Sequence, residues 1–288
     1  MATVKALNVK SYAGNPHVRF DEGEVASAAT PGRGSLLNKK KEGKMTMKLM
    51  AAAVLMAAIT ATGAETDAPK IGEPVKLDTP VIFIGDSMMK MLGKGMEKAF
   101  KAKNLTPAES FSSLGSGLAR PSVFNWPAKA KELCERVKPK TAFIALGTND
   151  RQSLESRTGS MAAVGTDEWR VEYKCRIEEL LDALYSNGIT HAVWMLTPPM
   201  KSDVNEQHAQ LVAGIVAEVA GDKKYRDRFH RYDMGKVLTI RPGRYTQTII
   251  SKTGAAISVR DTDGIHLSYQ GAKIVAEDVL RTYWPDKK

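Results

Sequence analysis

The chain has 288 residues, of which 43% are hydrophobic and 26% charged, an ordinary globular composition that excludes collagen-like, coiled-coil and wholly disordered proteins. Its formal net charge is +10, but residues 1–64 carry half of that excess, and the other +5 is spread over residues 65–288. A charge this dilute does not predict a nucleic-acid-binding face. The two cysteines, Cys134 and Cys175, are too few for a disulfide scaffold or a cysteine-rich zinc site.

The segment 45–64 has the organisation of an export signal. Lys48 precedes an apolar run from Leu49 to Ala61, about 13 residues long and too short to span a bilayer. The small residues Thr62-Gly63-Ala64 follow, so we predict a signal peptide that is cleaved after Ala64 rather than a buried helix or a membrane anchor. We therefore expect an exported protein, periplasmic or secreted, with no stable membrane span.

Residues 1–44 lie upstream of that signal and have no sustained apolar periodicity. Because a signal peptide normally begins near the start of a chain, we expect translation to start at Met45 or Met47. Residues 1–44 would then be untranslated; the alternative is a disordered extension that lengthens the charged start of the signal. In either case we expect the fold to be one domain within 65–288, with its core at about 80–285.

From residue 80 onward, short apolar runs that are typical of buried strands alternate with stretches of helical composition. The predicted elements, in chain order, are strand 81–84, helix 88–103, strand 108–113, helix 127–137, strand 141–146, helix 167–187, strand 191–196, helix 203–220, strand 229–232, hairpin 245–260 and helix 269–283. This alternation predicts an α/β fold in which helices cover both faces of a parallel sheet.

Binding and catalytic residues of such folds collect at the carboxyl ends of strands. Four polar segments occur at or near these positions. They are Gly85-Asp86-Ser87, Ser113-Leu114-Gly115-Ser116-Gly117-Leu118, Gly147-Thr148-Asn149-Asp150 and Asp263-Gly264-Ile265-His266.

A Ser-His pair is the chemistry that these segments offer. A serine hydroxyl is a poor nucleophile until a base takes its proton, and histidine is the side chain that titrates near neutral pH. Of the five histidines, His266 alone has an acid close to it in a loop, so we predict it to be the base for Ser87. Asp263, three residues earlier, could orient the imidazole and stabilise its cation, and Asp261 is an alternative.

The four segments resemble the four conserved blocks of the SGNH hydrolases, also called GDSL esterases, over most of residues 80–280. The strings GLARPSVFNWP, GTNDRQ, LTPPM and DGIHLS are similar to an exported bacterial branch of that family. The resemblance implies a three-layer α/β/α sandwich with a parallel, flavodoxin-like sheet. It favours Asp263 over Asp261 as the third and least essential member of a Ser-His-Asp triad. Met88 stands where the family has leucine, an apolar change of similar size.

The resemblance also implies an oxyanion hole. Its donors would be the backbone amides of Ser87 and Gly117 and the side-chain amide of Asn149. Glycine permits a close backbone approach, and an asparagine amide donates without titrating. Gly115 is the alternative to Gly117. The other interpretations are an Asx turn at Asn149-Asp150 and a flexible loop around Gly117.

Four further side chains could contact a substrate. Arg120 and Arg151 directly follow the second and third segments, where they could hold a carboxylate or a sugar hydroxyl, or be solvated loop residues. Trp126 and Trp169 could stack on a sugar ring, but packing in the core is the more typical role.

The sequence thus predicts an exported serine esterase that acts on small acyl esters, with O-acetyl groups on a carbohydrate as the expected substrate class. That class follows from the resemblance and the compartment. One alternative is an O-acyltransferase for an envelope glycan, which would need a membrane partner as acyl donor. Another is a non-catalytic glycan-binding envelope protein. No metal or cofactor is implied. If the helices that carry Cys134 and Cys175 are neighbours, a disulfide could form after export.

Overall fold

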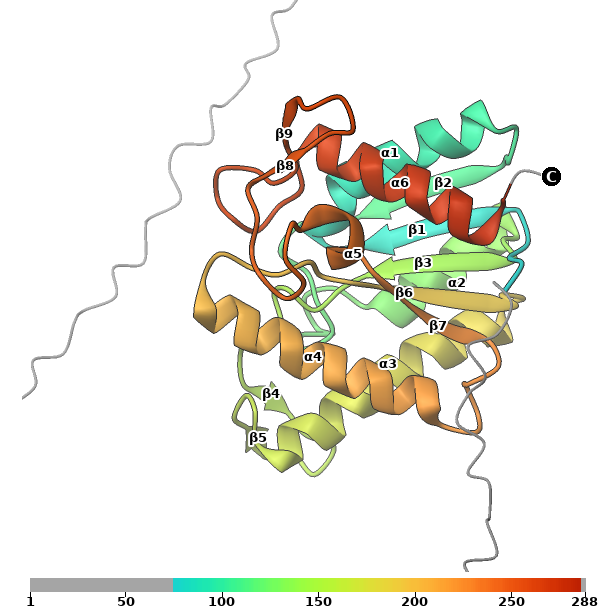
Figure 1. The fold of residues 1–288 in the computed structure, drawn as a ribbon. Helices are drawn as coiled ribbons and strands as arrows, with labels where there is room; N and C mark the ends of the chain where they lie inside the picture. Colours follow the sequence, from blue (N-terminus) through green and yellow to red (C-terminus); the bar gives the residue numbers. More distant parts are fainter. Residues whose placement is uncertain (1–74, 286–288) are drawn as a thin grey trace, which may run out of the picture. The chain divides into compact units, whose positions relative to one another are not determined.

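The computed structural model of the protein describes residues 75–285, so the segments predicted at 1–44 and 45–64 lie outside the described residues. A parallel five-stranded sheet has the order β2-β1-β3-β6-β7 (Figure 1). Its strands are β1 (Val81–Gly85), β2 (Ala108–Ser112), β3 (Thr141–Ala145), β6 (His191–Leu196) and β7 (Phe229–Asp233). The chain adds β2 on one side of β1 and the later strands on the other. The strand order therefore reverses between β1 and β3, the kind of point where ligands bind in open α/β sheets.

The central strands are apolar on both sides because helices cover both faces of the sheet. Every residue of β1 and β3 is buried. Along β1, Ile82 and Ile84 belong to one hydrophobic cluster, whereas Val81 and Phe83 belong to a second. Since successive side chains of a strand point to opposite faces, these are the clusters of the two faces.

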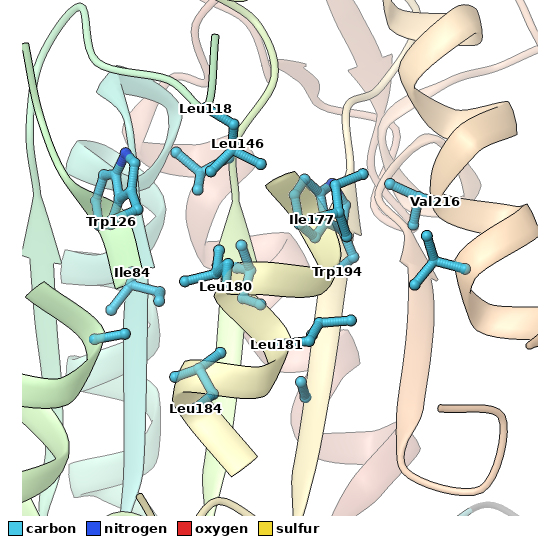
Figure 2. Close-up of a cluster of buried hydrophobic side chains, with 14 of the residues drawn as sticks. Ile84, Leu118, Trp126, Leu146, Ile177, Leu180, Leu181, Leu184, Trp194 and Val216 are labelled. Atoms are coloured by element: carbon cyan, nitrogen blue, oxygen red, sulfur yellow. The ribbon is translucent and has the colours of Figure 1, made fainter. Parts of the chain in front are cut away.

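The helices form the two outer layers (Figure 1). Their bounds are α1 (Ser87–Ala102), α2 (Trp126–Val137), α3 (Asp167–Ser186), α4 (Asp203–Gly221), α5 (Gly235–Leu238) and α6 (Tyr269–Tyr283). Side chains of α1, α5 and α6 enter one cluster, and those of α2, α3 and α4 enter the other, part of which Figure 2 shows. The predicted three-layer α/β/α sandwich is confirmed. Between residues 75 and 285, no helix has both the length and the apolar character needed to cross a membrane.

Two short hairpins lie outside the sheet. One is β8 (Thr248–Ile250) with β9 (Ala256–Ser258), inside the hairpin predicted at 245–260. The other, β4 (Leu154–Glu155) with β5 (Met161–Ala162), was not predicted, and neither was α5, since elements of two to four residues have no detectable periodicity.

The structure decides two questions that the sequence left open. Helices α2 and α3 are neighbours, but Cys134 and Cys175 are both free, so the disulfide considered above is not formed. Burial raises the pKa of the Cys134 thiol to about 11. Trp126 and Trp169 are both buried in the core, which leaves neither ring available for stacking on a sugar.

Candidate active site

A tight turn from β1 into α1 places Ser87 at the carboxyl edge of the sheet. Asp86 caps the helix, because its side chain accepts a hydrogen bond of 2.8 Å from the Met88 amide. Gly85 is needed for the close approach of β1 to β3, since a Cβ there would lie 2.2 Å from the Ala145 carbonyl oxygen. Ser87 is therefore the half-buried first residue of α1, and its own amide is in the first turn, where N–H groups have no helical acceptor.

His266 and Asp263 come to Ser87 from the loop that precedes α6. The distance from His266 Nε2 to Ser87 Oγ is 2.7 Å, and that from His266 Nδ1 to Asp263 Oδ2 is 2.5 Å. With its proton on Nδ1, the imidazole donates to Asp263 and accepts from the serine hydroxyl. The Asp261 carboxylate instead accepts from the Thr262 amide at 2.7 Å, so Asp263 is the acid in contact with the ring.

The electrostatics keep Asp263 ionised. Burial by itself would raise its pKa, but hydrogen bonds from the His266 ring and from the amides of Ile265 and His266 outweigh that effect. They hold the pKa of Asp263 at about 2. At neutral pH a carboxylate therefore lies beside the imidazole and would stabilise a positive charge on it.

The other described histidines make different contacts. His208 Nε2, on α4, donates to the Gly147 carbonyl at 2.9 Å, and burial lowers the pKa of His208. His191 and His230 bond to each other at 3.1 Å, on β6 and β7. Among the residues the structure describes, only the His266 ring makes a hydrogen bond with Ser87 Oγ.

The two other polar segments are joined to each other beside the serine. Asn149 Nδ2 donates to the Ser116 carbonyl at 2.9 Å, which ties the segment after β3 to the segment after β2. A Cβ on Gly117 would lie 2.0 Å from Asp150 Oδ1, whereas a Cβ on Gly115 would meet nothing within 4 Å. The close approach that only glycine permits therefore occurs at Gly117, not at Gly115.

Asp150 organises the Gly117 loop, a role that sequence reasoning missed. Its fully buried carboxylate accepts from the amides of Leu118 (3.0 Å) and Ala119 (2.8 Å) and from the Tyr173 hydroxyl (2.7 Å). The sequence placed Asp150 in a polar segment and suggested only an Asx turn. These partners lie 23 to 32 residues away, so no local pattern could identify them.

A cavity of about 110 Å³ lies against the serine. Ser87, Asn149 and His266 are part of its wall. Most other wall residues are apolar, and they include Leu146, Trp194, Leu196, Met200, Val212 and Ile265. Arg120 and Arg151 are exposed and are not part of this wall, so the structure does not bring them into the cavity.

Four residues separate this cavity from a larger one. Leu196, Thr197, Ala209 and Ala213 line both the cavity at Ser87 and a second cavity of about 520 Å³ beside α5. Residues 75–285 contain no group of three or more His, Cys, Asp or Glu side chains placed to hold a metal ion.

Burial raises the pKa of Asp86 to about 7, although hydrogen bonds from Thr148 and Met88 favour its charged form. The folded state therefore binds a proton here more tightly than the unfolded chain, and this contribution to stability is lost as pH rises from about 4 to 7. We therefore compare the free energy of unfolding of Asp86→Asn with that of wild type. We expect the difference, variant minus wild type, to rise by about 2 to 4 kcal/mol from pH 5 to pH 8. Urea unfolding of both proteins at the two pH values measures this, and an equal difference at both values would contradict it.

A parallel sheet of this order, with serine, asparagine and histidine gathered at its carboxyl edge, is an SGNH hydrolase-like α/β fold. The chain belongs to the family described as protein of unknown function (DUF459), whose model matches residues 80–282. No curated protein matches the sequence.

Three solved structures to which this chain is similar have identities of 14% to 17%. A GDSL-like lipase from Bacteroides thetaiotaomicron has 14% identity and a TM-score of 0.45, over 70% of this chain and 85% of that one. A mutant of the acetyl-xylooligosaccharide esterase Axe2 from Geobacillus stearothermophilus has 17% identity and a TM-score of 0.47, over 75% and 100%. The C-terminal catalytic domain of the peptidoglycan O-acetyltransferase OatA from Streptococcus pneumoniae has 17% identity and a TM-score of 0.41, over 72% and 93%.

Proposed function

We propose that the protein is an exported serine esterase that hydrolyses small acyl esters, with O-acetyl groups on a carbohydrate as the substrate class. The observation that carries the proposal is the hydrogen-bonded series Ser87–His266–Asp263 at the wall of a small cavity. Export is supported by the signal-like segment 45–64.

The reaction has two halves. Ser87 Oγ attacks the ester carbonyl while His266 Nε2 takes the hydroxyl proton, and the ionised Asp263 stabilises the imidazolium. His266 then gives that proton to the leaving alcohol as the bond from carbonyl carbon to alcohol oxygen breaks. In the second half, His266 takes a proton from water, which attacks the acyl carbonyl. The bond from carbonyl carbon to Ser87 Oγ then breaks, His266 returns the proton to Oγ, and the acid is released.

The oxyanion of each tetrahedral intermediate would be stabilised by the amides of Ser87 and Gly117 and by Asn149 Nδ2. The Met88 amide is not available, because the Asp86 carboxylate occupies it. Asn149 Nδ2 uses one hydrogen on Ser116, and its second hydrogen remains for the oxyanion.

The size of the cavity supports a short acyl group. An apolar cavity of about 150 Å³ holds benzene, so about 110 Å³ suits an acetyl to butyryl chain and not an octanoyl chain. We expect kcat/KM for p-nitrophenyl octanoate to lie at least about tenfold below that for the acetate, since methylenes without room lose their binding energy.

Leu196 provides a direct test of this limit, because it is one of the residues between the two cavities. Leu196→Ala should join them and raise kcat/KM for the octanoate relative to the acetate by about tenfold, on the scale of a few buried methylenes. Leu211→Ala is the matched control, since Leu211 is a half-buried leucine of α4 outside both cavity walls. A wild type that prefers octanoate would contradict the short-acyl assignment.

The decisive experiment offers acetylated envelope and plant-type sugars to wild type and to Ser87→Ala, and measures acetate release. Serine-dependent release of free acetate supports the esterase. Transfer of acetyl to an added glycan, in preference to water, would contradict the esterase assignment and favour an acyltransferase. Glycan binding without fluorophosphonate labelling of Ser87 would contradict the esterase assignment and favour a non-catalytic binding protein.

A further inference from the structure

The loops that carry His266 and Gly117 have little regular structure of their own, so other groups must hold them against Ser87. Two buried arginines contact these loops in the same way. Arg260 contacts the His266 loop, and Arg176, on α3, contacts the Gly117 loop.

Arg260 holds the backbone just before the histidine. It is only 2% exposed. Its Nη2 donates to the carbonyl of Ile265 at 2.8 Å and to that of Gly264 at 3.2 Å. Its Nη1 donates to the Pro199 carbonyl at 2.7 Å, in the segment that follows β6. One guanidinium therefore joins the histidine loop to the end of a central strand.

Arg176 makes the corresponding contacts at the other loop. It is 9% exposed. Its Nη1 donates to the carbonyls of Leu118 (3.0 Å) and Ala119 (3.1 Å), and its Nη2 donates to the carbonyl of Glu155. The amides of Leu118 and Ala119 go to Asp150, so both polar edges of the backbone after Gly117 are occupied by buried side chains.

Stability alone is a weak reason to bury the charge of Arg260, whereas Arg176 has the Glu172 carboxylate 3.4 Å from its Nε. The hydrogen bonds of Arg260 described above go to carbonyl oxygens, and its burial lowers the pKa of Arg260 from the ordinary arginine value. Replacing a buried ion pair by well-packed apolar groups is often neutral or stabilising, so the burial of a charge is weak evidence that it serves stability. The guanidinium group of an arginine is planar and has several N–H donors in fixed positions. It can therefore hold two backbone segments at a set separation, which a lysine ammonium does not.

We propose that Arg260 and Arg176 are positioning residues, which fix His266 and Gly117 respectively at the distances from Ser87 that the reaction needs. The proposal rests on the proposed esterase function. Neither arginine contacts the triad side chains or lines the cavity at Ser87; each acts through the backbone of a loop.

The test compares Arg260→Met, Arg260→Lys, Arg176→Met and Arg176→Lys with a matched control, Arg228→Met. Arg228 stacks on the Tyr185 ring at 3.8 Å and contacts neither loop. Circular dichroism and melting temperature establish that each variant is folded, and the lysine variants keep the charge if the methionine variants do not fold. We expect kcat for p-nitrophenyl acetate to fall by about 10- to 100-fold in the four variants, as for a misplacement of about 1 Å, and to be unchanged in Arg228→Met.

A second readout separates positioning from general structural damage and does not need activity. The His266 Nδ1 proton, bonded to Asp263, should give a downfield NMR signal. We expect the Arg260 variants to shift or lose that signal and the Arg176 variants to keep it. Folded Arg260 and Arg176 variants with kcat within about threefold of wild type and an unchanged signal would overturn the proposal. If wild type hydrolyses no ester, the proposed function fails, but the NMR signal still tests the role of Arg260.

Discussion

Replacing Ser87 with alanine is expected to lower the hydrolysis of p-nitrophenyl acetate by at least about 10³-fold and to abolish fluorophosphonate labelling. The hydroxyl would be the nucleophile, and its Oγ is within 2.7 Å of the His266 ring. His266→Ala should cost a similar factor, because members of a triad act as a unit. Steady-state kinetics on purified protein, with labelling read by mass spectrometry, measures both effects.

The alanine variant should remain folded, because Asp86 rather than Ser87 caps α1. Asp263→Ala serves as the graded comparison, and we expect a smaller loss, since this substitution removes charge stabilisation but leaves the serine and the imidazole in place. Wild-type turnover by a Ser87→Ala preparation that contains no contaminating esterase would rule out the proposed mechanism.

Replacing Gly117 with alanine is expected to lower kcat by about 10²-fold and to destabilise the fold by about 1 to 3 kcal/mol. The new Cβ would lie 2.0 Å from Asp150 Oδ1, so either the loop or the carboxylate must move. Movement of the loop would withdraw the Gly117 amide, which we propose as an oxyanion donor. Kinetics with p-nitrophenyl acetate and urea unfolding measure the two effects.

Gly115→Ala is the matched control in the same loop. A Cβ there meets nothing within 4 Å, although its φ of +69° makes alanine unfavourable by about 1 to 2 kcal/mol. We expect kcat to stay within about threefold of wild type, since no oxyanion donor moves. Equal losses of activity in both variants would mean that the loop tolerates no side chain at all and would remove the case for Gly117 as the specific donor.

Local patterns were sufficient where local physics determines the structure. The apolar runs at 81–84 and 141–146 became β1 and β3, because a strand covered on both faces must be apolar on both. The pairing of Asp263 with His266 was also predictable, since they are three positions apart and a turn brings them together. The tight turn at Gly85-Asp86-Ser87 was recognisable from its residue types alone.

Other predictions depended on how distant segments meet. Arg120 and Arg151 follow the right segments, yet their side chains are exposed and do not line the cavity at Ser87. Cys134 and Cys175 lie on neighbouring helices without forming a disulfide. Adjacency in sequence or between helices specifies neither the direction of a side chain nor its distance from a partner.

The sequence by itself determined the alternation of strands and helices, the order of the four polar segments and the identity of Ser87, His266 and Asp263 as candidates. Only the tertiary structure decided that Ser87 and His266, 179 residues apart, make a hydrogen bond. It alone showed the close approach of Gly117 to Asp150 and revealed the contacts of Asp150, Arg176 and Arg260. The reason is physical: periodicity and turn chemistry act over a few residues, whereas buried polar groups are paired by the packing of segments far apart in the chain.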